Sequence, residues 1–79
     1  MNVNNDRQKL IQETIDRMIK EGIETAMARD IYLHVLFKFP EKSEELKFTG
    51  PKQVGKLLNS MPIKFYKSFD TVPKIYLLK

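Results

Sequence analysis

Lysine and amide side chains recur at helical spacing in the segment FTGPKQVGKLLNSM, residues 48–61. One side of such a helix carries Lys52, Gln53, Lys56 and Asn59, and the other side is apolar. Lysine ammonium groups bind phosphates, and glutamine or asparagine amides pair with the edge of adenine. The pattern predicts a helix that contacts DNA through its polar side. The plain alternative is a lysine-rich face that only meets solvent.

The same segment contains the letters of a phosphate-binding loop, from Gly50 to Lys56. That loop needs Ser or Thr directly after its lysine, for the metal ion, and free backbone amides around the phosphates. Here Leu57 follows the lysine, and Pro51 removes one of the amides. These two positions exclude a nucleotide-binding loop.

The remaining reactive side chains form no catalytic or metal-binding pattern. His34 is the only histidine and the chain has no cysteine, so neither a thiolate metal site nor a catalytic triad is available. Glu41, Glu44 and Glu45 lack the spacing and the central glycine of a calcium loop. We therefore expect a protein that is not an enzyme and has no cofactor, no metal and no small-molecule substrate, and we expect His34 to be half-buried and structural.

The formal net charge of +4 is distributed unevenly along the chain. Residues 1–48 carry eight Lys or Arg against nine Asp or Glu, a balance of −1. Residues 49–79 carry six Lys against Asp70 alone, a balance of +5. A basic excess confined to one end indicates a polyanionic partner, most often nucleic acid, although it also serves solubility.

Two amphipathic helices are expected in the first half of the chain. The first spans residues 5–22, ends at Gly22, and has an apolar stripe of Leu10, Ile11, Ile15, Met18 and Ile19. This stripe either packs in the core, which the short chain favours, or contacts a partner protein. The second helix spans residues 25–38 and ends before Pro40, with a stripe of Ile31, Tyr32, Val35, Leu36 and Phe39. A strand is the alternative for IYLHVLFKF.

A short helix and a hairpin are expected in the second half. After a connection with one helical turn at residues 43–46, the third helix runs from Gly50 to Ser60, with Pro51 at its first position and Gly55 allowing a close approach. Residues 63–79 then alternate as two strands around the turn DTVP. We expect Phe65, Phe69, Ile75 and Leu77 in the core. Tyr66 and Tyr76 are open to either cross-strand packing or base stacking.

The segments IYLHVLF, TGPKQVGKLLNSM and IKFYKS…VPKIYLLK, taken in this order, carry a family resemblance. From about Tyr32 to Leu78 the chain resembles the winged-helix domains at the C-terminal end of primase–helicases from phages and other mobile elements. The resemblance implies an α+β fold, a three-helix winged helix-turn-helix with a C-terminal β-hairpin wing. Residues 25–79 would form this winged-helix core and residues 5–22 an added N-terminal helix, all within a single domain, 1–79.

The resemblance and the charge pattern together imply a small DNA-binding protein of the cytoplasm. It would be a replication or transcription accessory factor of a phage or mobile element, without membrane contact. The expected nucleic-acid-binding residues are Lys52, Gln53, Lys56, Asn59, Lys64, Tyr66, Lys67 and Lys74. The alternative is a protein-interaction module that docks on a host or element-encoded nucleic-acid enzyme. A replication or transcription protein could then be contacted through the N-terminal helix.

Overall fold

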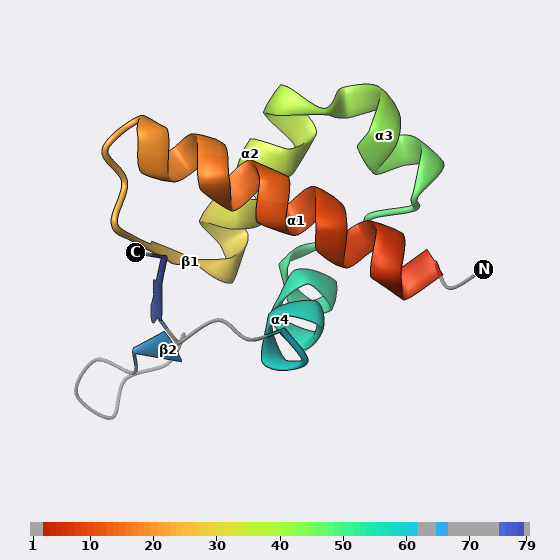
Figure 1. Cartoon of the computed structure of the whole chain (residues 1–79). Helices are drawn as coiled ribbons and strands as arrows, with labels where there is room; N and C mark the ends of the chain where they lie inside the picture. Colours follow the sequence, from red (N-terminus) through yellow and green to blue (C-terminus); the bar gives the residue numbers. More distant parts are fainter. Residues whose placement is uncertain (1–2, 62–64, 67–74, 79) are drawn as a thin grey trace.

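The fold is α+β, and the described residues form four helices and a small antiparallel sheet (Figure 1). The computed structural model describes residues 3–61, 65–66 and 75–78, the side chains of 65 and 66 excepted. The elements in chain order are α1 (Val3–Lys20), β1 (Thr25–Met27), α2 (Ala28–Lys38), α3 (Pro40–Glu45), α4 (Pro51–Asn59), β2 (Phe65–Tyr66) and β3 (Ile75–Leu77). The predicted α+β class is therefore confirmed.

Helix α1 forms where the apolar stripe predicted it and ends at the predicted glycine. The amide of Ile23 donates to the Met18 carbonyl (3.0 Å) and the amide of Gly22 donates to the Ile19 carbonyl (3.0 Å). These two bonds are a Schellman motif, which needs a left-handed residue, and Gly22 supplies it with a φ of 89°. The stripe of α1 is buried except for Ile19, which is partly buried.

One apolar core joins α1 to the rest of the protein. Its buried members include Ile11 and Ile15 of α1, Val35 of α2, and Val54 and Leu58 of α4. Thr14 is also fully buried, and its hydroxyl donates to the Leu10 carbonyl (2.8 Å), so this polar group is satisfied inside the helix. The stripe of the first helix is thus core.

The start of the second helix differs from the prediction, because Thr25–Met27 is a strand. This strand pairs antiparallel with β3, with Ala26 opposite Tyr76. Helix α2 begins only at Ala28, after Met27 in an extended conformation, and the Met27 amide donates to the Asp30 carboxylate (3.2 Å). The prediction of a helix from Thr25 was wrong because pairing with a segment about fifty residues away overrides the helix propensity of Ala26 and Met27.

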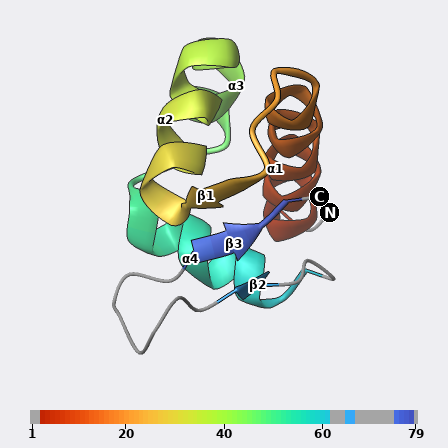
Figure 2. The same cartoon turned by 90° about the vertical axis from the view of Figure 1, so that its left-hand side faces the viewer.

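The sheet has the strand order β1–β3–β2, seen from top to bottom in Figure 2. Phe65 pairs with Tyr76 and Tyr66 with Ile75, so the two strands of the predicted hairpin are antiparallel. The predicted turn at residues 70–73 lies outside the described residues.

The predicted inward face of β3 was wrong. Tyr76 is buried, with 3 % of its surface exposed, whereas Leu77 is 36 % exposed and Ile75 is partly buried. Tyr76 packs over α4, with its hydroxyl oxygen 3.7 Å from where a Cβ on Gly55 would lie. Gly55 therefore allows the sheet to approach α4 closely, and not only another helix, as the sequence suggested. Of the other predicted core positions, the side chain of Phe65 and all of Phe69 lie outside the described residues.

The connection between α2 and α4 contains a helix of its own. Helix α3 starts at Pro40, earlier than the single turn predicted at residues 43–46, because Pro40 occupies its first position and Ser43 donates to the Pro40 carbonyl (2.8 Å). Its C-terminal end resembles that of α1: the Phe48 amide donates to the Ser43 carbonyl (2.9 Å), and Lys47 adopts a φ of 58°. The buried ring of Phe48 then anchors the chain before α4.

Candidate nucleic-acid interface

Helix α4 lies at one edge of the molecule, below α1 in Figure 1, and has one buried and one open side. Its boundaries match the prediction, with Gly50 as N-cap, Pro51 in the first turn and Ser60 as C-cap. Val54, Leu57 and Leu58 are buried in the core. This burial fixes the rotation of the helix, so that the residues between them face away from the protein.

Lys52, Lys56 and Asn59 occupy the open side of α4, and all three are exposed. Within the described part of the chain, none of their side chains has a hydrogen bond or an ion pair. No Asp or Glu occurs between Glu45 and Asp70, so the helix carries no acid of its own. Two uncompensated lysines one turn apart, beside an amide, give this side of α4 a local positive charge, which attracts anions.

Gln53, the other residue predicted on this face, makes hydrogen bonds within the protein instead. Its side-chain oxygen accepts a hydrogen bond from the Thr49 amide (2.9 Å), and its nitrogen donates to the Lys47 carbonyl (3.2 Å). The side chain is half-buried and holds the loop before α4. With both ends of the amide engaged, Gln53 supports the position of the helix and is not free to bind a base.

The second half of the predicted surface cannot be compared with the structure. Lys64, Lys67 and Lys74 lie outside the described residues, and for Tyr66 only the backbone, in β2, is described. Tyr76 lies in the core, and burial raises its pKa above the ordinary value for tyrosine. It packs against α4 and is not a stacking platform at the surface.

A polar hollow lies beside α4, and the sequence did not predict it. The Gln8 side chain of α1 donates to the Ser60 hydroxyl (2.7 Å), which itself donates to the Leu57 carbonyl (3.0 Å). This contact places the first turns of α1 next to the exposed Lys56 of α4. No local pattern signals it, since the two residues that meet are 52 positions apart in the sequence.

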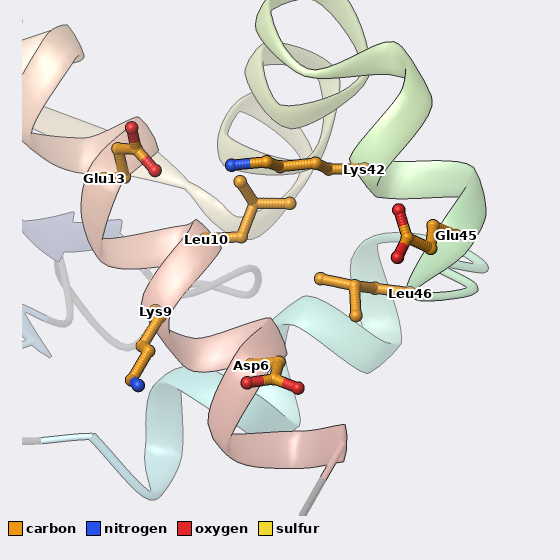
Figure 3. A pocket seen from close by; sticks show the side chains of 7 residues that line it. All are labelled: Asp6, Lys9, Leu10, Glu13, Lys42, Glu45 and Leu46. Carbon is orange, nitrogen blue, oxygen red and sulfur yellow. The ribbon is translucent and has the colours of Figure 1, made fainter.

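A second hollow, between α1 and α3, mixes charges of both signs (Figure 3). Leu10 and Leu46 contribute its apolar surface, and the charged side chains at its edge are Asp6, Lys9, Glu13, Lys42 and Glu45. The three carboxylates point in different directions and come from separate turns (Figure 3). Among the described residues, no three His, Asp or Glu side chains are grouped so that they could hold a metal ion.

The C-terminal half of α2 exposes apolar side chains that the sequence analysis did not single out. Phe37 is 88 % exposed and Leu33, one turn before it, is 45 % exposed. Two shallow hollows flank Phe37, one with His34 and Lys38 and one with Leu36 and Pro40. His34 is half-buried, as predicted. Phe37 and Leu33 together form a small exposed apolar surface on this part of α2.

Comparison with protein-family models, with curated proteins and with solved structures found no match to this chain. None of the helices in the described residues is long and apolar enough to cross a membrane.

Proposed function

We propose that this protein is a small winged helix-turn-helix DNA-binding protein that is not an enzyme and that contacts DNA with the open side of α4. The observation that carries the proposal is the pair of exposed, unpaired lysines, Lys52 and Lys56, on a helix without acids. An α-helix with such a side fits the major groove, which is about 12 Å wide. Accessory roles in replication or transcription of a phage or mobile element belong to the same proposal.

The arrangement of the elements supports the winged-helix assignment. Helix α2 packs on α4 more extensively than any other pair of described elements, as the two helices of a helix-turn-helix do. Helix α4 is followed by the antiparallel strands β2 and β3, which is the order of a recognition helix and its wing. The short helix α3 and the strand β1 are additions to the arrangement expected from the sequence.

The salt dependence of DNA binding tests the proposal. Each phosphate contact contributes about 0.9 to the slope of log affinity against log salt concentration. Replacing Lys52 and Lys56 together with alanine should therefore reduce the slope for a duplex by about two units. Fluorescence anisotropy over a series of salt concentrations measures this change.

A matched control removes the same charge elsewhere. Lys20 at the end of α1 and Lys42 in α3 are also exposed and belong to other elements. The Lys20→Ala/Lys42→Ala variant should keep the slope of the unmodified protein. If the Lys52→Ala/Lys56→Ala variant keeps that slope as well, α4 does not contact DNA and the proposal is wrong.

The second candidate function is a protein-interaction module that docks on a nucleic-acid enzyme. The exposure of Phe37 and Leu33 favours it, since burying such side chains against a partner stabilises a complex. This surface lies on the part of α2 that leads to α3, at the end of the molecule away from α4 (Figure 2). Substitutions on the two surfaces therefore act independently.

The experiment for the second candidate compares capture by two variants. A replication or transcription enzyme identified from a lysate should bind the unmodified protein and the Lys52→Ala/Lys56→Ala variant, but not Phe37→Ser. If the Lys52→Ala/Lys56→Ala variant no longer captures the enzyme while Phe37→Ser still does, the second candidate function is contradicted.

A further inference from the structure

The hollow between α1 and α4 is lined mostly by polar side chains. The side chains that line it include Asn4, Asn5 and Gln8 from α1, and Gln53, Lys56 and Ser60 from α4. These are amides, one hydroxyl and one ammonium group. None of the described residues that line the hollow is acidic.

Hydrogen bonds hold the two walls of this hollow together. The bond from Gln8 to the Ser60 hydroxyl (2.7 Å) crosses from α1 to α4, and Ser60 is fixed in turn by the Leu57 carbonyl (3.0 Å). On the α1 side, the Asn4 oxygen accepts a bond from Arg7 (3.1 Å). The walls are therefore positioned before any ligand arrives, which reduces the entropy lost on binding.

Two side chains at the hollow have hydrogen-bond donors that no described residue accepts from. The side chains of Asn5 and Lys56 make no hydrogen bond or ion pair with any other described residue. Both side chains are exposed at the edge of the hollow. They offer an amide and an ammonium group to a ligand that carries acceptor oxygens.

The nearest acid on α1 faces another way. Asp6 lies in the first turn of α1, beside Asn5, but its carboxylate borders the hollow between α1 and α3 (Figure 3). Among the described residues, the hollow beside α4 therefore has donors and a positive charge and no carboxylate that would repel an anion. A phosphodiester group, which has only acceptor oxygens and one negative charge, matches this set of groups.

We propose that this hollow seats one backbone phosphate of duplex DNA, held by Lys56 together with the amide of Asn5, so that α1 takes part in DNA binding. The inference depends on the proposed function, because Lys56 belongs to both surfaces. It extends the contact from α4 across to the first turns of α1.

A gain of charge at Asn5 tests the seat directly. Asn5→Lys places an ammonium group at the hollow, and it should steepen the salt dependence of duplex binding by about one unit. At low salt the affinity should rise several-fold. Phe37→Lys adds the same charge at an exposed position on α2 and should leave the slope unchanged.

A loss variant completes the test. Asn5→Glu puts a carboxylate beside the phosphate and should weaken binding about tenfold at low salt, whereas the charge-matched Phe37→Glu should weaken it far less. Circular dichroism of each variant confirms that it folds. Because both residues are exposed, the fold should be kept.

The outcomes separate the two proposals. If the Asn5 variants behave like the Phe37 variants while Lys52→Ala/Lys56→Ala reduces the slope by about two units, α4 binds DNA and the seat on α1 is wrong. If the lysine variant also keeps its salt dependence, both proposals are wrong. A steeper slope with Asn5→Lys, together with an unchanged slope with Phe37→Lys, supports the seat.

Discussion

Tyr76 shows how a single side chain links the sheet to the helix proposed to bind DNA. Its ring is buried, and its hydroxyl lies over Gly55 of α4. Burial disfavours the charged phenolate, so the pKa of Tyr76 is raised above its ordinary value. Ionisation of this group must then oppose folding.

The pH dependence of stability follows from this raised pKa. Below the pKa of an unfolded tyrosine, about 10, the contribution of neutral Tyr76 is complete. As the pH rises from there through the higher pKa of the folded state, the free energy of unfolding should fall. Chemical denaturation at a series of alkaline pH values measures this, and Tyr76→Phe should show a smaller fall. An equal fall in both proteins would contradict the assignment.

At the level of single elements, helix α4 contains a glycine that lowers its stability and that can be replaced. Gly55 sits in the middle of the helix, where glycine is less favourable than alanine by about 1 kcal/mol. A Cβ at this position would lie 3.7 Å from the Tyr76 hydroxyl and 3.9 Å from the Ala28 Cβ, which are ordinary contacts. The space for a methyl group is therefore present.

Gly55→Ala should raise the free energy of unfolding by about 0.5–1 kcal/mol. The substitution points at Ala28 and Tyr76, not at the exposed lysines, so the salt dependence of DNA binding should not change. Urea denaturation measures the first effect and anisotropy the second. A loss of stability would mean that the sheet and α2 approach α4 more closely than the distances above indicate.

Elements with a local cause could be predicted from the sequence. The apolar stripe and Gly22 located α1, and Pro51 and the spacing of Val54, Leu57 and Leu58 located α4 with its open side. Strand β1 could not be predicted, because it depends on pairing with β3, about fifty residues later. A three-residue segment has too little pattern of its own to reveal such pairing.

The site could be predicted only in part, for the same reason. Lys52, Lys56 and Asn59 lie on the open side because the period of one helix places them there. The role of Gln53 depends on where the loop from Lys47 to Thr49 turns, and the place of Asn5 depends on how α1 crosses α4. The spacing of residues along the chain predicts neither the role of Gln53 nor the place of Asn5.

At the scale of the whole molecule, α1 and α4 belong to one packed unit. Ile11 of α1 is fully buried in the cluster that also contains Val54 and Leu58 of α4. A protein of 79 residues has a total stability of about 4–12 kcal/mol. Removing one such side chain is therefore a large change for the whole fold.

Ile11→Ala should lower the free energy of unfolding by about 2–4 kcal/mol, since it leaves a cavity between the helices. The loss should affect every element together, so circular dichroism and tyrosine fluorescence should report the same denaturation midpoint. Gln12→Ala, its exposed neighbour, should change stability by less than about 0.5 kcal/mol. Two separate transitions would show that α1 unfolds apart from the other helices.

A titration of the isotope-labelled protein with a short DNA duplex, followed by nuclear magnetic resonance, would locate the surface that binds DNA. If the open side of α4 binds DNA, the largest changes in amide chemical shift should fall on α4, around Lys52, Lys56 and Asn59. Shifts confined to the part of α2 around Phe37, or no shifts at low salt, would contradict it.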